Sequence, residues 1–234
     1  MKNLDALFFA AHPDDVELSC GGMIIKLVNS GKKVGIIDLT QGELSTRGNL
    51  KSRAIETKNA SKALGIHIRE NLKIRDGNIE NTESNRKKII EVVRKYKPKY
   101  VFAPYNHDRH PDHINASRLL TEAFFYSGLP KIKTKLPAYR PEKVLYYAQH
   151  YDIPVSFIFD ISDVYEKKLE AVKCYKTQFF TDAKGPQTYI SGKAFSDNFE
   201  ARAINWGYRI GVKYGEPYFT ESNVKITEET LFKI

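Results

Sequence analysis

One stretch near the N-terminus constrains both the fold and the chemistry of this chain. Residues 7–11 (LFFAA) form an apolar run typical of a buried strand, and residues 18–28 have the pattern of a helix. Between them, residues 12–15 read HPDD. In an open α/β sheet, ligands bind where a strand ends and a helix begins. A turn of this kind usually holds a phosphate. Because carboxylates repel a phosphate and attract a cation, this turn predicts a metal site instead.

The rest of the chain predicts a mainly parallel α/β sheet of Rossmann-like type. Strand-like and helix-like segments alternate through the first half, an order that favours helices on both faces of the sheet and right-handed crossovers. Several segments end at glycine or before proline, as helices usually do. The expected strands are residues 6–11, 33–39, 66–72, 100–104, 144–148 and 156–160, and the expected helices are residues 18–30, 50–64, 82–97, 113–126, 162–177 and 195–206.

The pattern becomes less regular after residue 128. The sequence shows no low-complexity segment and no internal repeat. Its length suits one α/β domain with a short extension. We therefore expect a single domain over residues 1–234. Residues 1–128 would form the α/β core, and residues 129–234 would be an extension that completes the sheet and the substrate side.

Composition narrows the classes of function. The net charge of +9 could serve a nucleic-acid surface, but the basic residues are scattered, so we expect no nucleic-acid partner. No apolar run approaches the roughly 18 residues of a membrane span, and the N-terminus lacks the pattern of a signal peptide. The only cysteines, Cys20 and Cys174, are far apart, which argues against a disulfide framework and against a cysteine-based zinc site. We expect a cytoplasmic protein without a membrane partner.

A second group of acidic and imidazole side chains follows the predicted strand at residues 100–104. Residues 106–113 (NHDRHPDH) hold three of the six histidines of the chain. A doubly wound strand order would bring this loop beside the first motif. His12, Asp15 and His113 would then supply two imidazoles and one carboxylate, the composition of a catalytic zinc site with a position left for water, one ion per chain. The same set could hold Fe²⁺ as a facial triad.

Hydrolysis needs further groups beside the metal ligands. Asp14 lies next to a predicted ligand and suits the role of a base that takes a proton from the attacking water, although it could instead cap the following helix. His110, three residues before His113, suits the stabilisation of a developing oxyanion. Asp112 could orient His110 from behind.

These two motifs together resemble a known family. AHPDDxE at residues 11–17 and HPDH at residues 110–113 are similar to the motifs of the LmbE-like (PIG-L) zinc-dependent N-deacetylases, and the order of elements agrees over roughly the first 125 residues. The resemblance implies a hydrolase that removes the acetyl group from an N-acetylglucosamine derivative. It also implies the roles given above for His12, Asp15 and His113 as zinc ligands, for Asp14 as base and for His110 as stabiliser of the tetrahedral intermediate.

A finer resemblance concerns the substrate. The loop at residues 42–48 (GELSTRG) is similar to the bacillithiol-biosynthesis branch of the family, whose substrate is N-acetylglucosaminyl malate. The resemblance implies that Arg53 binds substrate, and Arg109 could reach a substrate carboxylate. Some relatives place a tyrosine near the start of the last helix to assist the oxyanion, whereas this chain has Phe195 there and Tyr189 nearby. Some relatives are hexamers, so we expect a homo-oligomer.

Several alternatives stay open. The substrate could be another N-acetylglucosamine conjugate or a chitooligosaccharide, and the same triad could serve a non-hydrolytic ferrous enzyme or a degenerate sugar-binding protein. Arg53 could be a surface charge paired with Glu56, three residues later on the same helix. We expect His107 to bond within its loop, and His67 and His150 to be ordinary surface or half-buried histidines.

Overall fold

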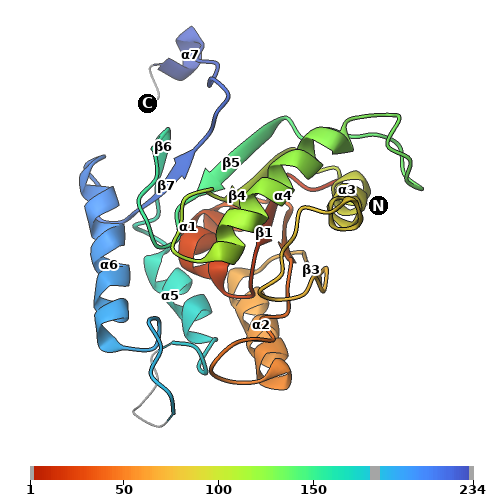
Figure 1. Cartoon of the computed structure of the whole chain (residues 1–234). Helices are drawn as coiled ribbons and strands as arrows, with labels where there is room; N and C mark the ends of the chain where they lie inside the picture. Colours follow the sequence, from red (N-terminus) through yellow and green to blue (C-terminus); the bar gives the residue numbers. More distant parts are fainter. Residues whose placement is uncertain (1–2, 180–184, 232–234) are drawn as a thin grey trace.

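The computed structural model describes residues 3–179 and 185–231. Within them, seven strands form one sheet with the order β3-β2-β1-β4-β5-β7-β6 (Figure 1). The strands are β1 (Ala6–Ala10), β2 (Val34–Asp38), β3 (Ile68–Asn71), β4 (Tyr100–Pro104), β5 (Lys143–Tyr147), β6 (Phe157–Asp160) and β7 (Gly215–Phe219). The helices of the described part are α1 (Asp15–Asn29), α2 (Leu50–Leu64), α3 (Glu83–Tyr96), α4 (Pro111–Ser127), α5 (Tyr165–Lys173), α6 (Lys193–Tyr208) and α7 (Glu228–Leu231).

The predicted α/β fold class is confirmed. The strands from β3 to β5 in the sheet order pair in parallel, whereas β7 pairs antiparallel with both β5 and β6. The sheet is therefore mixed but mostly parallel. Helices α3 and α4 cover one face, and α1, α2, α5 and α6 lie on the other (Figure 1). None of the described helices combines the length and apolarity that a bilayer crossing requires.

The apolar run of β1 lies at the centre of the sheet and supplies both halves of the core. Leu7 and Phe9 face the cluster under α3 and α4, and Phe8 and Ala10 face the cluster under α1 and α5. All four side chains are fully buried. A strand covered on both faces reads as a continuous apolar run rather than an alternating one, which explains the pattern at the start of the chain.

The structure corrects several predicted elements. Strand β7 was not expected, because Gly215, Glu216 and Pro217 are residues that strands normally avoid. Pro217 is tolerated because β7 pairs with β5 only beyond it, at Tyr218 and Phe219. Helix α5 is also shorter than predicted.

The first residue of the predicted helix, Ser162, does not cap α5. The Ser162 hydroxyl and backbone N–H both donate to Asp160 Oδ1, so Ser162 stabilises a turn before the helix. Val164 is the N-cap residue and makes no side-chain capping bond. Helix α1 begins at Asp15, three residues earlier than expected, which places the acidic motif in its first turn.

Glu216 on β7 fastens the C-terminal half of the chain to α1. Its carboxylate accepts hydrogen bonds from the backbone N–H groups of Gly22 at 2.8 Å and Met23 at 2.9 Å. Lys168 of α5 donates to the same carboxylate at 2.8 Å. The close packing of α1 at this point requires glycine, since a Cβ at Gly22 would lie 2.4 Å from a side-chain carbon of Ile161. The Gly21–Gly22 pair therefore serves helix packing.

Candidate active site

The two motifs meet at the carboxyl edge of the sheet. Strands β1 and β4 are neighbours, so the loop and helix start after β1 lie beside the loop and helix start after β4. Residues 12–15 come from the first connection, and residues 106–113 come from the second. This is the edge at which α/β sheets bind ligands.

The structure brings the three predicted metal ligands together. His12, Asp15 and His113 each offer a ligand atom, and these atoms all lie within 4.8 Å of one another. Asp15 lies between the imidazoles, with Oδ1 3.3 Å from Nε2 of His113 and Oδ2 3.6 Å from Nδ1 of His12. Asp15 and His113 are buried, and His12 is partly exposed to the cleft. Two imidazoles and a carboxylate at this spacing could hold a metal ion and leave a position open for water.

The electrostatics of this set favour a positive charge. Burial alone would lower the pKa of His113, but Asp15 and Asp108 outweigh it and raise the pKa to about 9. Burial alone would also lower the pKa of His12. Hydrogen bonds with Asp112, Asp15 and Asp76 outweigh this effect and raise the pKa well above its ordinary value. The imidazoles in turn hold the pKa of Asp15 well below its usual range despite its burial. A bound divalent cation would replace these protons, so the residues present fit a metal.

Asp14 lies beside this set in an unusual conformation. Its φ of 121° is in the region that side chains rarely adopt, and such residues cost about 1–3 kcal/mol and concentrate at functional sites. Asp14 holds the N-cap position of α1, but its buried carboxylate makes no capping hydrogen bond, so the side chain does not cap the helix. Burial raises its pKa to about 7, Asp15 adds to the shift, and Arg53 opposes it. A carboxylate with this pKa is poised to accept a proton near neutrality.

His110 is placed to donate a hydrogen bond. Burial, together with the charges on His12 and His113, lowers its pKa to about 4, so the ring is neutral near pH 7. Its Nδ1 accepts from the backbone N–H of Asp112 at 3.2 Å. A neutral imidazole with an accepting Nδ1 carries its proton on Nε2. The ring centroid lies 4.8 Å from those of His12 and His113, so the ring lies beside the two predicted imidazole ligands.

The expected contact between the Asp112 carboxylate and His110 is corrected. The Asp112 carboxylate instead accepts from the backbone N–H of Gly77 at 2.8 Å and lies 3.3 Å from Nε2 of His12. The side chain points to His12 because α4 begins at Pro111 and turns Asp112 inward in its first turn. Asp112 therefore orients a predicted metal ligand.

Three residues around the site were not singled out by the sequence. Asp76 Oδ1 lies 3.0 Å from His12 Nε2. Asp108 lies 2.8 Å from Nδ1 of His113 and 3.1 Å from Nδ1 of His150. Hydrogen bonds from these imidazoles hold the pKa of Asp108 well below its usual value in spite of burial. Asp108 stood inside the histidine-rich loop and could have been found there, whereas His150 carries no local signal.

A buried network of ionic and hydrogen-bonded side chains holds the first turn of α1 in place. Glu17, one turn after Asp14, is fully buried and accepts from Arg69 of β3 at 2.5 Å and from the Tyr175 hydroxyl at 3.0 Å. Arg69 also bridges both oxygens of Asp38 at the end of β2. A bidentate pair of this kind fixes geometry as well as charge. The network therefore ties the first turn of α1 to β2 and β3.

The predicted metal ligands His12, Asp15 and His113 line a cleft of about 440 Å³. One wall is the loop after β2, including Ser45, which accepts from Arg53 at 2.5 Å. Arg53 is buried and also donates to Asp14 at 2.8 Å. It does not pair with Glu56, which instead accepts from Thr177 at 2.8 Å and 2.9 Å. The surface-pair alternative for Arg53 is therefore wrong.

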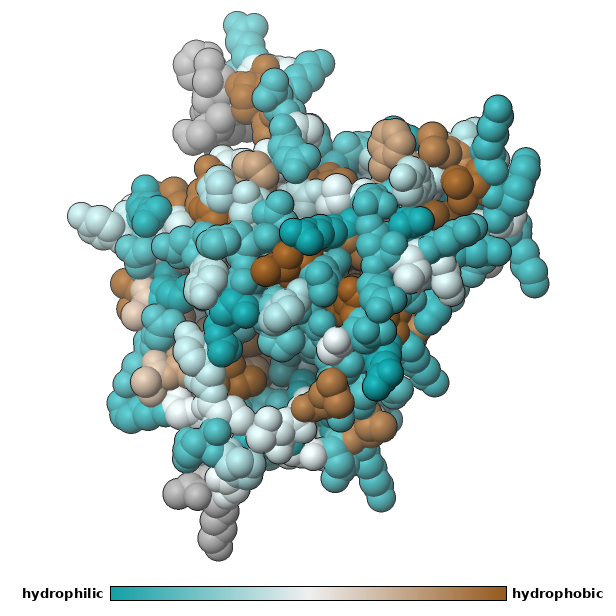
Figure 2. Space-filling model, viewed as in Figure 1, coloured by the Kyte–Doolittle hydropathy of each residue, from teal (hydrophilic) through white to brown (hydrophobic). Residues whose placement is uncertain are grey.

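The opposite wall carries aromatic and cationic groups. Arg109 is exposed, and its guanidinium lies 4.2 Å from the ring of Tyr189. Tyr189 also lies 5.6 Å from the ring of His150 and lines the cleft. Phe195 packs against Phe179, with ring centroids 5.8 Å apart. The tyrosine hydroxyl available to the cleft is therefore that of Tyr189. Hydrophilic residues surround scattered apolar ones on the molecular face shown in Figure 2.

An open α/β sheet with this His-Asp-His set, an adjacent buried carboxylate and a neutral imidazole has the groups that metal-assisted hydrolysis uses. The chain belongs to the PIG-L family, described as GlcNAc-PI de-N-acetylase, whose pattern matches residues 7–124. The sequence is 33% identical over 183 residues to the diacetylchitobiose deacetylase of Thermococcus kodakarensis, a match that covers 73% of this chain and 68% of that protein.

Solved structures agree with this membership. A conserved protein from Thermus thermophilus superposes with a TM-score of 0.88 and 34% identity, over 96% of this chain and 98% of that one. The N,N'-diacetylchitobiose deacetylase of Pyrococcus horikoshii, solved with an inhibitor, superposes with a TM-score of 0.80 and 26% identity, over 92% of this chain and 82% of that one. The expected membership of the LmbE-like (PIG-L) family is therefore confirmed.

Proposed function

We propose that this protein is a zinc-dependent N-deacetylase that hydrolyses the acetamide of an N-acetylglucosamine conjugate. The observation that carries the proposal is the position of Asp14, a buried carboxylate directly beside the His12–Asp15–His113 set. Metal binding alone would need only the three ligands. The strained backbone of Asp14 and its pKa of about 7 add what hydrolysis needs.

A zinc ion held by His12, Asp15 and His113 would polarise the acetamide carbonyl and lower the pKa of a water molecule. Asp14 takes a proton from the attacking water, and Arg53 holds its carboxylate in place at 2.8 Å. The Nε2–H of His110 donates to the oxyanion that develops on the carbonyl. Asp14, now protonated, passes its proton to the leaving amine. Asp108 and Asp112 keep the imidazoles of His113 and His12 in fixed orientations.

Two substrates are candidates for the cleft. N-acetylglucosaminyl malate is supported by Arg47 and Arg109 on the cleft wall, since arginine binds carboxylates well. Arg53 lines the cleft too, and its charge is shared with Asp14. A chitooligosaccharide is supported by the relative from Thermococcus kodakarensis, whose name records activity on diacetylchitobiose. The exposed ring of Tyr189 could stack on a second sugar.

The test is acetate release by the zinc-loaded protein from three substrates at equal concentration: N-acetylglucosaminyl malate, diacetylchitobiose and free N-acetylglucosamine. Preference for the malate glycoside, with a KM that rises in Arg109→Met, would place the protein in the bacillithiol branch. Preference for diacetylchitobiose would keep the deacetylase and reject that branch. Zinc-loaded protein that releases acetate from none of the three would contradict the proposal.

A further inference from the structure

A second cavity adjoins the catalytic cleft. It has a volume of about 70 Å³ and lies between α6, α5 and the first turns of α1. Leu18 and His150 line both the cavity and the cleft, so the two spaces share a wall. A single water needs only about 15 Å³ of such a cavity. The cavity can therefore hold a molecule of a few non-hydrogen atoms.

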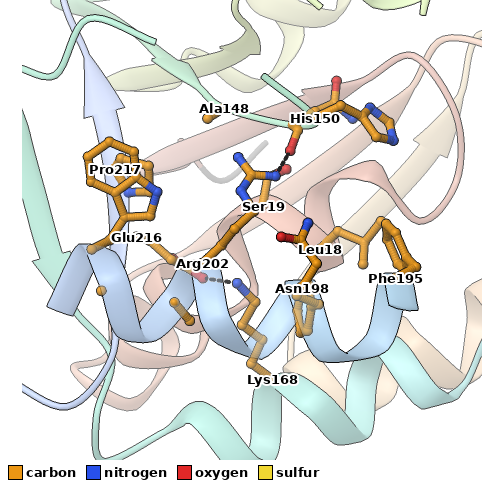
Figure 3. Close-up of a pocket in the computed structure, with 15 residues that line it drawn as sticks. Leu18, Ser19, Ala148, His150, Lys168, Phe195, Asn198, Arg202, Glu216 and Pro217 are labelled. Carbon is orange, nitrogen blue, oxygen red and sulfur yellow. Dashed lines mark hydrogen bonds and ion pairs between the residues drawn. The ribbon is translucent and has the colours of Figure 1, made fainter. Parts of the chain in front are cut away.

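The cavity carries one uncompensated positive charge. Figure 3 shows Arg202 of α6 in the middle of the lining residues, with its guanidinium directed toward the segment that bears His150. Arg202 donates to the backbone carbonyl of Gln149. No carboxylate lies within 4.0 Å of it among residues 3–179 and 185–231. The other cation there, Lys168, is neutralised by Glu216 at 2.8 Å.

Arg202 is half-buried and has no carboxylate at ion-pair distance among the described residues. Burial lowers its pKa, and the more distant carboxylates of Asp152 and Asp108 only partly oppose this. An arginine nevertheless stays charged in proteins. Within the described residues, the Gln149 side chain also has a buried Oε1 without a hydrogen-bond partner. Turning this amide over would present its NH₂ group instead.

Apolar side chains line the cavity as well, beside the polar Ser19, His150 and Asn198. Phe195, Phe199 and Trp206 contribute aromatic surface from α6. A guanidinium and aromatic rings that line the same small cavity suit a small anion with a short alkyl group. The reaction proposed for the adjoining cleft releases such an anion, because hydrolysis of an acetamide breaks the C–N bond and yields acetate and an amine.

We propose that this cavity is a binding site for the short-chain carboxylate that deacetylation releases, with the carboxylate on Arg202 and the methyl group against the aromatic rings. The identity of the ligand as a reaction product rests on the proposed function. The site itself rests on the cavity, its unpaired cation and the shared wall of Leu18 and His150. It holds acetate beside the cleft, not at the metal ligands.

The test is saturation-transfer NMR with acetate on protein freed of metal by chelation. Without the metal, acetate cannot bind at the metal ligands and give a second signal. Wild-type protein should bind acetate, and Arg202→Met should weaken the binding at least tenfold. Arg109→Met is the matched control, since it removes an arginine from the cleft and should leave acetate binding in place. Arg202→Lys keeps the positive charge but not the planar guanidinium. Its affinity for acetate should lie between those of wild type and Arg202→Met. Propionate should bind, and hexanoate should exceed the cavity.

Circular dichroism and thermal melting establish that the variants are folded. Should Arg202→Met fail to fold, Ala203→Leu narrows the same cavity and should also abolish the acetate signal. Equal acetate binding by wild type and the folded Arg202 variants, or no binding to wild type, would overturn the site. The measurement needs no turnover. Acetate bound through Arg202 by a protein without deacetylase activity would refute the proposed function alone, and an active enzyme with Arg202-independent binding would refute the cavity alone.

Discussion

Replacing Glu216 by glutamine tests how the C-terminal half of the chain holds α1, the helix that begins with the catalytic motif. Oε1 of Glu216 accepts from Gly22 N–H and from Lys168, and Oε2 accepts from Met23 N–H and from the Tyr218 hydroxyl. Each carboxylate oxygen thus faces two donors. An amide in this place must direct its NH₂ group at a backbone N–H, whichever way it is turned.

The loss in the free energy of unfolding can be estimated from the burial of the two side chains. Glu216 and Lys168 are 2% and 3% exposed, so the substitution leaves a buried ammonium without its counter-charge. Breaking a buried ion pair on one side costs about 3–5 kcal/mol. With a urea dependence of about 3 kcal/mol per molar, the unfolding midpoint should fall by about 1 M or more. Adding Lys168→Met removes the unpaired charge and should recover part of this loss.

The assay is urea unfolding followed by circular dichroism. Glu122→Gln is the matched control, because Glu122 pairs with Arg86 at 3.4 Å on the surface, and exposed pairs contribute about 0–1 kcal/mol. A Glu216→Gln protein within about 1 kcal/mol of wild type would refute the reasoning. So would a Lys168→Met addition that lowers stability further.

Three further substitutions probe the site and its support. Asp14→Asn should keep the metal and lose at least about a hundredfold in acetate release, the usual contribution of a general base, and near-wild-type turnover would remove Asp14 from that role. Asp108→Asn should weaken zinc affinity about 10–100-fold, as expected when the partner of a ligating histidine is lost, and unchanged affinity in a chelator competition would contradict its positioning role. Gly22→Ala should destabilise the fold by about 1–3 kcal/mol through overpacking, and an unchanged melting temperature would show that Ile161 can yield.

The elements that could be predicted from sequence are those with local signals. The apolar β1, the helix cap at Asn49 and the glycine at position 65 all appear where their residue types indicate, with the Asn49 side chain accepting from Ser52 N–H at 2.9 Å. Strand β7 could not be predicted, because Glu216 and Pro217 oppose a strand locally. They are stabilised there by partners from α1, α5 and β6.

The residues of the candidate site likewise fall into those that the sequence could identify and those that it could not. His12, Asp15 and His113 could be grouped because two motifs at strand ends point to one edge of the sheet. Asp76 and His150 could not, since each reaches the site through a loop whose path depends on the whole fold. Arg202 is 52 residues further along the chain than His150 and sits on a helix with no motif. Its position beside the cleft follows only from the packing of α6.

Zinc titration of metal-stripped protein tests the central claim most directly, with acetate release from an N-acetylglucosamine conjugate as the readout. Wild-type activity should be absent without metal and rise in proportion to added zinc until one ion is bound per chain. His113→Ala, with one ligand missing, should bind zinc weakly and stay inactive. Full activity in metal-stripped protein, or His113→Ala that holds stoichiometric zinc and releases acetate at the wild-type rate, would contradict the account.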